Sequence, residues 1–152
     1  MNEKAMKEPY ELTREIDIQA SPETVFTFLT QEARIKEWLA EVAEIDARPG
    51  GVFHIGTFDG IHCRGEFLEV VPNEKVVFTW GGVENLEAGE STVEIVLRSQ
   101  GNGTHLTLRH FNIRLKPSAE SFGEGWKDHA LPLLKEIAEG RTPDGLCFES
   151  GN

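Results

Sequence analysis

The sequence predicts an α+β domain, in which helices cover one face of an antiparallel sheet. Three observations lead to this prediction. Apolar and polar residues alternate in about six segments, most of them joined by short turns rich in Gly, Pro, Asp and Asn. Helix start signals follow the first of these segments, and one long amphipathic segment follows the last. Strands joined by short turns pair antiparallel, and helices gathered on one face of such a sheet define the α+β class.

The N-terminal part of the chain is expected to form one strand and two short helices. Apolar and polar residues alternate from Tyr10 to Gln19, which indicates a half-buried strand. Ser21 has the side chain of a helix N-cap, and Pro22 suits the first helical position. The buried side of this helix is expected to consist of Val25, Phe26 and Leu29. A second short helix is expected over residues 33–39, with Trp38 as its anchor.

Turn residues bound five further expected strands, at residues 52–57, 61–71, 76–80, 91–98 and 104–113. The first hairpin has two candidate registers. A two-residue turn would place three polar side chains of the second strand on the apolar face, which is costly. A three-residue loop over residues 58–60 instead sets Cys63 beside Ile55 and Gly65 beside Phe53. The sequence therefore favours the three-residue loop.

The long C-terminal helix is expected to run from Ser121 to Gly140. Ser121 and Glu124 have the spacing of a capping box, and Gly140 suits the position just after the last turn. The residues expected on its buried face are Phe122, Trp126, Ala130, Leu133 and Ile137. Pro132 cannot donate a hydrogen bond to the Asp128 carbonyl, so the sequence predicts a kink there.

Length and composition restrict the class of protein. A chain of 152 residues suits one domain, expected over residues 10–140, with loosely ordered ends at 1–9 and 141–152. The net charge of −11 argues against nucleic-acid partners and against anionic membrane surfaces. A charged N-terminus, the lack of a long apolar run and two cysteines without framework spacing favour a cytoplasmic protein. A monomer or a weak homodimer is expected.

Five groups of segments, in this order, carry a resemblance to a known family: residues 20–26, 50–53, 65–72 with 77–80, 104–110, and 125–126 with Leu133 and Ile137. Together they resemble the START/SRPBCC superfamily and, within it, the AHSA-like family, named for the activator of a heat-shock chaperone ATPase. The chain departs from the family pattern at Ala130, where leucine is usual, and at Pro132. The resemblance implies a helix-grip fold, a curved sheet around a long C-terminal helix with room for a cavity between them. It implies no single activity, because the superfamily includes lipid carriers, cyclases and co-chaperone modules.

The inward-facing positions are apolar and largely aromatic, as in sites for hydrophobic small molecules. Gly65, and Gly123 or Gly125, are expected to point inward and leave room, as is Ala130. The alternative is a fully packed core. The candidate ligand-binding residues are Phe26, Trp38, Phe53, Ile55, Cys63, Phe67, Phe78, Trp80, Ile95, Leu108, His110, Phe122, Trp126, Ala130 and Leu133.

Three functions remain open at this point. The leading hypothesis is a non-enzymatic module that binds a small hydrophobic or amphipathic ligand, with His110 as its polar contact. The second, implied by the resemblance alone, is a protein-interaction domain with a chaperone partner in the stress response. The third is an enzyme acting on a hydrophobic ring substrate, with His110 as acid–base. His110 also suits a core histidine bonded to a carbonyl or a tryptophan, and Cys63 a small core residue.

The sequence predicts neither cofactor nor metal. His54 and His62 are expected to point outward on adjacent strands, and a zinc site needs three or four ligands in tight spacing. We therefore expect a solvated face at these two histidines.

Overall fold

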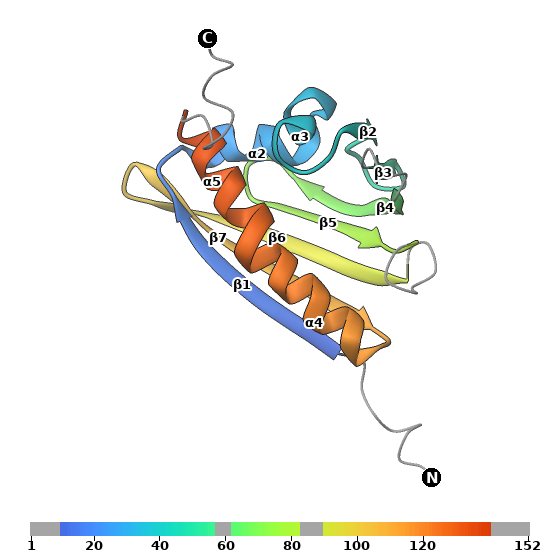
Figure 1. Ribbon diagram of the computed structural model, residues 1–152. Coiled ribbons are helices and arrows are strands. Elements are labelled where there is room, and N and C mark those ends of the chain that lie inside the picture. Colours follow the sequence, from blue (N-terminus) through green and yellow to red (C-terminus); the bar gives the residue numbers. More distant parts are fainter. Residues whose placement is uncertain (1–9, 57–61, 83–89, 141–152) are drawn as a thin grey trace.

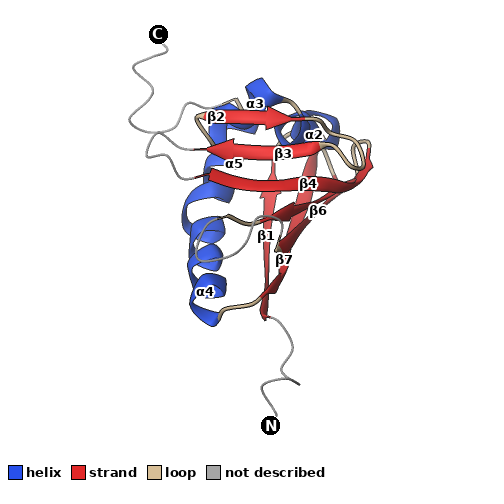
Figure 2. Ribbon diagram, turned by 90° about the vertical axis from the view of Figure 1, so that its right-hand side faces the viewer, coloured by secondary structure: helices blue, strands red, loops and turns tan. Residues whose placement is uncertain are grey.

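The computed structural model describes residues 10–56, 62–82 and 90–140. These residues form one antiparallel sheet in the order β1-β7-β6-β5-β4-β3-β2. The strands are β1 (Tyr10–Ile18), β2 (Val42–Ile45), β3 (Val52–Gly56), β4 (His62–Val71), β5 (Lys75–Trp80), β6 (Ser91–Gln100) and β7 (Gly103–Ile113). Figure 2 shows that the sheet is curved and that helices cover one of its faces. The predicted α+β, helix-grip architecture is confirmed.

The helices are α2 (Pro22–Thr30), α3 (Glu32–Trp38), α4 (Lys116–Gly125), η1 (Trp126–Ala130) and α5 (Leu131–Ala138). The last three form one continuous helix, which crosses the β1 side of the sheet diagonally, while α2 and α3 cover one end (Figure 1). In the part of the chain that the structure describes, no helix is both long enough and apolar enough to cross a membrane.

The helix starts near the N-terminus are largely as predicted. The Ser21 hydroxyl accepts a hydrogen bond from the Thr24 amide at 3.1 Å, and Pro22 opens α2. The indole of Trp38 is buried and donates to the Phe28 carbonyl at 2.9 Å, so it anchors α3 against α2. The prediction for Phe26 was wrong, because Phe26 is half-buried. The helical spacing instead buries Val25, Phe28 and Leu29.

The predicted register of the first hairpin is confirmed. Ile55 pairs with Cys63 and Phe53 pairs with Gly65, so the apolar side chains of both strands face the helices. The loop residues themselves, 57–61, lie outside the described residues. The predicted count of about six strands missed β2, a four-residue edge strand in which Ala43 and Ile45 are half-buried and the other two residues are exposed. So short a segment has too few alternations to identify a strand.

The C-terminal helix begins five residues earlier than predicted. It starts at Lys116, separated from the end of β7 by two residues, with Pro117 in its first turn and no side-chain cap. A proline fits there because the first helical amides have no partner within the helix. Ser121 and Glu124 therefore lie within the helix, and the predicted capping box was wrong. The predicted helix end is confirmed, since Gly140 has φ +87° just after the last turn.

At the place where the sequence predicts a kink, the helix contains a π turn, η1. The Leu131 amide donates to the Trp126 carbonyl, five residues back, in place of the usual partner four residues back. Pro132 follows immediately and has no amide hydrogen, so the ordinary helical ladder is already interrupted at this point.

The π turn also changes which face of the helix is buried. One additional residue rotates everything after it by about 100° relative to a continuous α-helix. As a consequence Leu131 and Leu134 are buried, and Leu133 and Ile137 are only half-buried. The predicted buried face was therefore right up to Trp126 and wrong beyond it.

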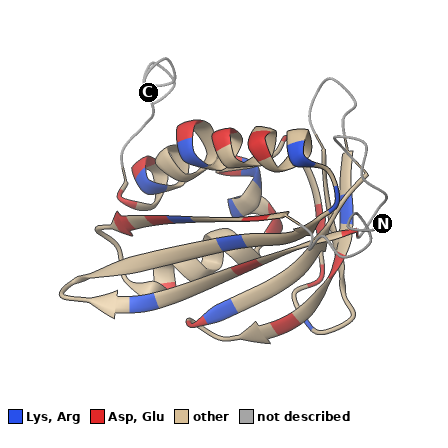
Figure 3. Cartoon of the chain, turned by 90° about the horizontal axis from the view of Figure 1, so that it is seen from below, with Lys and Arg blue, Asp and Glu red and all other residues tan. Residues whose placement is uncertain are grey.

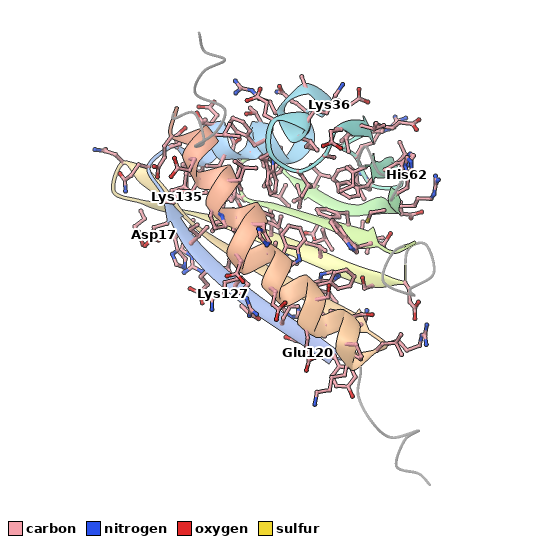
Figure 4. The ribbon with its side chains drawn as sticks, in the orientation of Figure 1. Asp17, Lys36, His62, Glu120, Lys127 and Lys135 are labelled. Carbon is pink, nitrogen blue, oxygen red and sulfur yellow. The ribbon has the colours of Figure 1, made fainter. Side chains whose placement is uncertain are left out.

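A hydrogen-bonded ion pair, of which only the glutamate is fully buried, attaches the end of this helix to β1. The side chain of Glu139 is 3% exposed, and its carboxylate accepts a hydrogen bond from the backbone amide of Gln19 at 2.7 Å. It also accepts from Lys135 Nζ at 2.8 Å, and Lys135 donates in turn to the Asp17 carbonyl at 2.7 Å. Lys135 and Asp17 lie side by side in Figure 4. These bonds fix the position of α5 over the sheet edge.

Candidate functional site

The space between the sheet and the helices is filled by an aromatic cluster. Phe53 stacks on Phe78 with ring centroids 4.1 Å apart, and Trp80 contacts Trp126 at 5.2 Å. The half-buried members of the predicted set are Phe26, Ala130 and Leu133. The buried members are Trp38, Phe53, Ile55, Cys63, Phe67, Phe78, Trp80, Ile95, Leu108, His110, Phe122 and Trp126.

A small apolar cavity lies among these side chains, at the end of the sheet that α2 and α3 cover. Its volume is about 10 Å³, close to that of a single water-sized probe. Five predicted residues line it: Trp38, Phe53, Phe78, Ile95 and Trp126. Four lining residues were not predicted: Phe28, Leu29, Ile35 and Leu39. The helical spacing of the apolar residues in 22–39 was the signal that could have identified them.

The glycines do not leave the room that the sequence suggested. A Cβ on Gly65 would overlap the Thr79 carbonyl oxygen, so this glycine allows β4 to approach β5 closely. A Cβ on Gly123 would lie 2.6 Å from the guanidinium of Arg14, which fills the space beneath the helix. Gly125 faces open space. The prediction that these positions create a pocket was wrong.

A chain of buried hydrogen bonds connects the C-terminal helix to three strands. Trp126 Nε1–H lies 3.2 Å from His110 Nδ1, and His110 Nε2 lies 2.8 Å from the Ser91 hydroxyl. The Ser91 hydroxyl donates to the Trp80 carbonyl at 2.7 Å. An indole can only donate, so His110 Nδ1 is the acceptor and the proton sits on Nε2. We call these four residues the histidine relay.

The histidine relay holds His110 neutral. The imidazole is fully buried, and burial lowers its pKa to about 3. Both ring nitrogens already have partners, so neither offers a free lone pair to a substrate. The arrangement matches the core-histidine interpretation and gives no support to the acid–base hypothesis.

Cys63 is also a core residue. Its thiol is buried, and burial raises its pKa to about 12. A thiol in this state is a poor nucleophile. Two strands, β5 and β6, separate it from His110.

The opposite face of the sheet carries the charged and polar groups. His105 on β7 lies between two carboxylates of β1, with Nδ1 2.6 Å from Asp17 and Nε2 2.7 Å from Glu15. The pKa of His105 is raised, mainly by the hydrogen bond to Asp17 and next by the hydrogen bond to Glu15. Along the C-terminal helix, acidic and basic residues are interspersed (Figure 3).

His54 and His62 point outward, as predicted, and their rings contact each other. His54 Nε2 and His62 Nδ1 are 2.7 Å apart. Burial, followed by the charges of Arg64 and His62, lowers the pKa of His54. Among residues 10–56, 62–82 and 90–140, no group of three or more His, Cys, Asp or Glu residues has the arrangement of a metal site.

A curved antiparallel sheet around one C-terminal helix, with two short helices after the first strand, defines a helix-grip domain with an apolar interior. The chain belongs to a particular family of such domains, the Activator of Hsp90 ATPase homolog 1-like proteins, whose family model matches residues 19–139.

Individual relatives agree with this assignment. The human activator of 90 kDa heat shock protein ATPase homolog 1 is 25% identical over 116 residues. That match covers 76% of this chain and 33% of the human protein, so the chain spans about a third of this relative's length. An AHSA1-like protein from Rhizobium etli is 34% identical, over 94% of this chain and 90% of that one, with a TM-score of 0.73. An Hsp90 activator from Plasmodium falciparum is 27% identical, over 86% and 96%, with a TM-score of 0.67.

Proposed function

We propose that this domain binds a small apolar molecule between the sheet and the helices, in a pocket that widens from the cavity beside Trp126. The observation that carries the proposal is the cavity wall, made of nine apolar residues from α2, α3, three strands and the π turn. Apolar walls of this kind are typical of sites for hydrophobic ligands.

The cavity must grow to admit such a molecule. Its volume of about 10 Å³ is far below that of an occupied ligand pocket. Two parts of the wall are suited to move. The helices α2 and α3 have nine and seven residues, and the wall at Trp126 is a π turn, an irregularity often found at functional sites. Ligand entry would then separate these elements from the sheet.

Native mass spectrometry of the full chain after incubation with a lipid extract tests the proposal. We expect a retained apolar species in the wild-type protein. Replacing Leu39, a half-buried wall residue, by Phe should fill the cavity and reduce retention. Leu133→Phe is the matched control, because Leu133 is a half-buried leucine that does not line the cavity. Equal retention by both variants, or none by the wild-type protein, would contradict the proposal.

The relatives favour a second candidate function, a protein-interaction domain that acts on an Hsp90-type chaperone. Two of the similar proteins carry the name of Hsp90 activators. An interaction surface of this kind usually exposes a contiguous apolar patch. In the described part of the chain the exposed large hydrophobic residues are Val42 on β2 and Leu68 on β4. Both are single residues on different strands.

An ATPase assay with a purified Hsp90-type chaperone separates the two functions. Stimulation of the chaperone's ATP hydrolysis by the full chain would support the second candidate. Lack of stimulation together with lack of complex formation in a pull-down would exclude it, and would leave the ligand proposal untouched.

A further inference from the structure

The His54–His62 pair on the outer sheet face has no part in either proposed function. The two residues lie on neighbouring strands, β3 and β4, and His54 is directly opposite Arg64 while His62 is opposite Gly56. The ring nitrogens are 2.7 Å apart and the ring centroids 4.8 Å apart. Figure 4 shows His62 at the end of the sheet that lies away from β1.

Gly56 makes this contact possible. A Cβ at Gly56 would lie 2.7 Å from both Cε1 and Nδ1 of His62. The imidazole of His62 therefore lies over the glycine, in space that any other residue would occupy. In that position the ring reaches sideways to His54. The contact between the His54 and His62 imidazoles therefore requires a glycine at position 56.

A carboxylate lies near the first of these rings. The Glu44 Oε1 atom on β2 lies 3.9 Å from His54 Nδ1. A carboxylate at that nitrogen favours the tautomer with its proton on Nδ1, so the lone pair of His54 Nε2 faces His62. A carboxylate that moves within hydrogen-bond distance of such a ring nitrogen orients imidazoles that bind metals.

We propose that His54 and His62 form a two-histidine chelate for a divalent transition-metal ion, with His54 Nε2 and His62 Nδ1 as its protein ligands. At metal–nitrogen distances of about 2.0–2.1 Å, two nitrogens bound at a right angle are about 2.9 Å apart, and at a tetrahedral angle about 3.4 Å. The two nitrogens are now joined by a hydrogen bond of 2.7 Å, so they must move apart least to reach the right-angled geometry. A right-angled pair suits the tetragonal geometry of Cu²⁺ and Ni²⁺ better than the tetrahedral geometry of Zn²⁺.

Binding requires two small changes. The partly buried rings turn so that both lone pairs point to one site, which the broad χ2 preference of histidine allows. The proton of His62 moves from Nδ1 to Nε2 through water, so the neutral pair releases no net proton. Water completes the coordination, because the described residues supply only two ligands here. The ion is therefore exchangeable. The exposed Arg64 opposes binding, since its positive charge lies opposite His54.

Isothermal titration of the full, tag-free chain with Cu²⁺, Ni²⁺ and Zn²⁺ at neutral pH tests this inference. We expect one site, with Cu²⁺ bound most tightly. His54→Gln and His62→Gln should each lower the association constant for Cu²⁺ about tenfold or more. His129→Gln is the matched control, because His129 is exposed on the C-terminal helix, and it should leave binding unchanged.

Two further measurements exclude indirect effects. Electron paramagnetic resonance of the Cu²⁺ complex should show coupling to two imidazole nitrogens in the wild-type protein and to one in each single variant. Arg64→Gln should strengthen binding, which a loss of folding could not produce. Wild-type binding no tighter than that of a His54→Gln/His62→Gln double variant, or equal affinity in the wild type and both single variants, would overturn the inference.

Discussion

Two tryptophans in the core differ in a way that isolates one hydrogen bond. Trp126 and Trp80 are 3% and 8% exposed, and their rings are in contact. Trp126 donates its indole hydrogen to His110, whereas Trp80 Nε1 is buried and has no hydrogen-bond partner among residues 10–56, 62–82 and 90–140. Replacing each by Phe removes the same atoms, so the comparison measures the bond to His110 rather than the loss of volume.

The expected magnitudes follow from these contacts. Indole to phenyl removes roughly 40 Å³, which at about 24 cal/mol per Å³ costs about 1 kcal/mol in either variant. Trp126→Phe also leaves His110 Nδ1 buried without a donor, at a further cost of about 1–3 kcal/mol. Trp80→Phe removes a donor that has no partner in the described part of the chain, so it leaves no described acceptor without its donor. We therefore expect Trp126→Phe to be the more destabilising by about 1–3 kcal/mol.

Urea unfolding at pH 7, followed by circular dichroism, measures both free energies of unfolding. The slope of the free energy against urea should be the same in both variants, so that the midpoints report stability alone. Equal destabilisation by the two substitutions would refute the histidine relay as a stabilising contact.

Three further predictions concern titration and the helix end. The pKa of His110 is about 3 in the folded state and 6.5 in the unfolded state, so the free energy of unfolding should decrease as the pH drops below 6.5. At pH 4.5 the loss from this group should be about 2–3 kcal/mol. NMR should show no titration of its ring above pH 4. The pKa of His105 is raised, so its stabilisation should be complete below pH 6.5 and lost as pH rises through the folded-state pKa. Asp17→Asn should move that pKa back toward 6.5 in an NMR titration. Glu139→Ala should lower the free energy of unfolding in urea by about 1.5–3 kcal/mol. The control Glu124→Ala, on the exposed helix surface, should lower it by less than about 0.5 kcal/mol.

Alternation and turn chemistry made the sheet predictable, because each carries its own local signal. The register of the first hairpin followed from the cost of burying polar side chains, and the pairing of Phe53 with Gly65 confirms it. The π turn was not predictable from local spacing. Pro132 indicated an interruption but not its form, and Leu131 and Leu134 fit the core only when one residue is added to the helix.

The cavity was half predictable. Its strand residues followed from alternation, since Phe53, Phe78 and Ile95 share the inward face. The prediction of free space beside Gly65 was wrong. A glycine leaves free space only where no other part of the chain fills the place of the missing side chain. Here the β5 backbone does approach, and the distance between strand backbones is a tertiary property.

Methyl NMR of the wild-type chain, titrated with apolar molecules such as benzene, indole and a medium-chain fatty acid, tests the proposed ligand site most directly. We predict that the methyl signals of Leu29, Ile35 and Ile95, which line the cavity, shift on binding. The methyl signals of Ile18 and Leu106, which are buried elsewhere in the core, should shift little. Unchanged signals at the three cavity residues, or equal shifts at all five, would contradict a ligand site at this cavity.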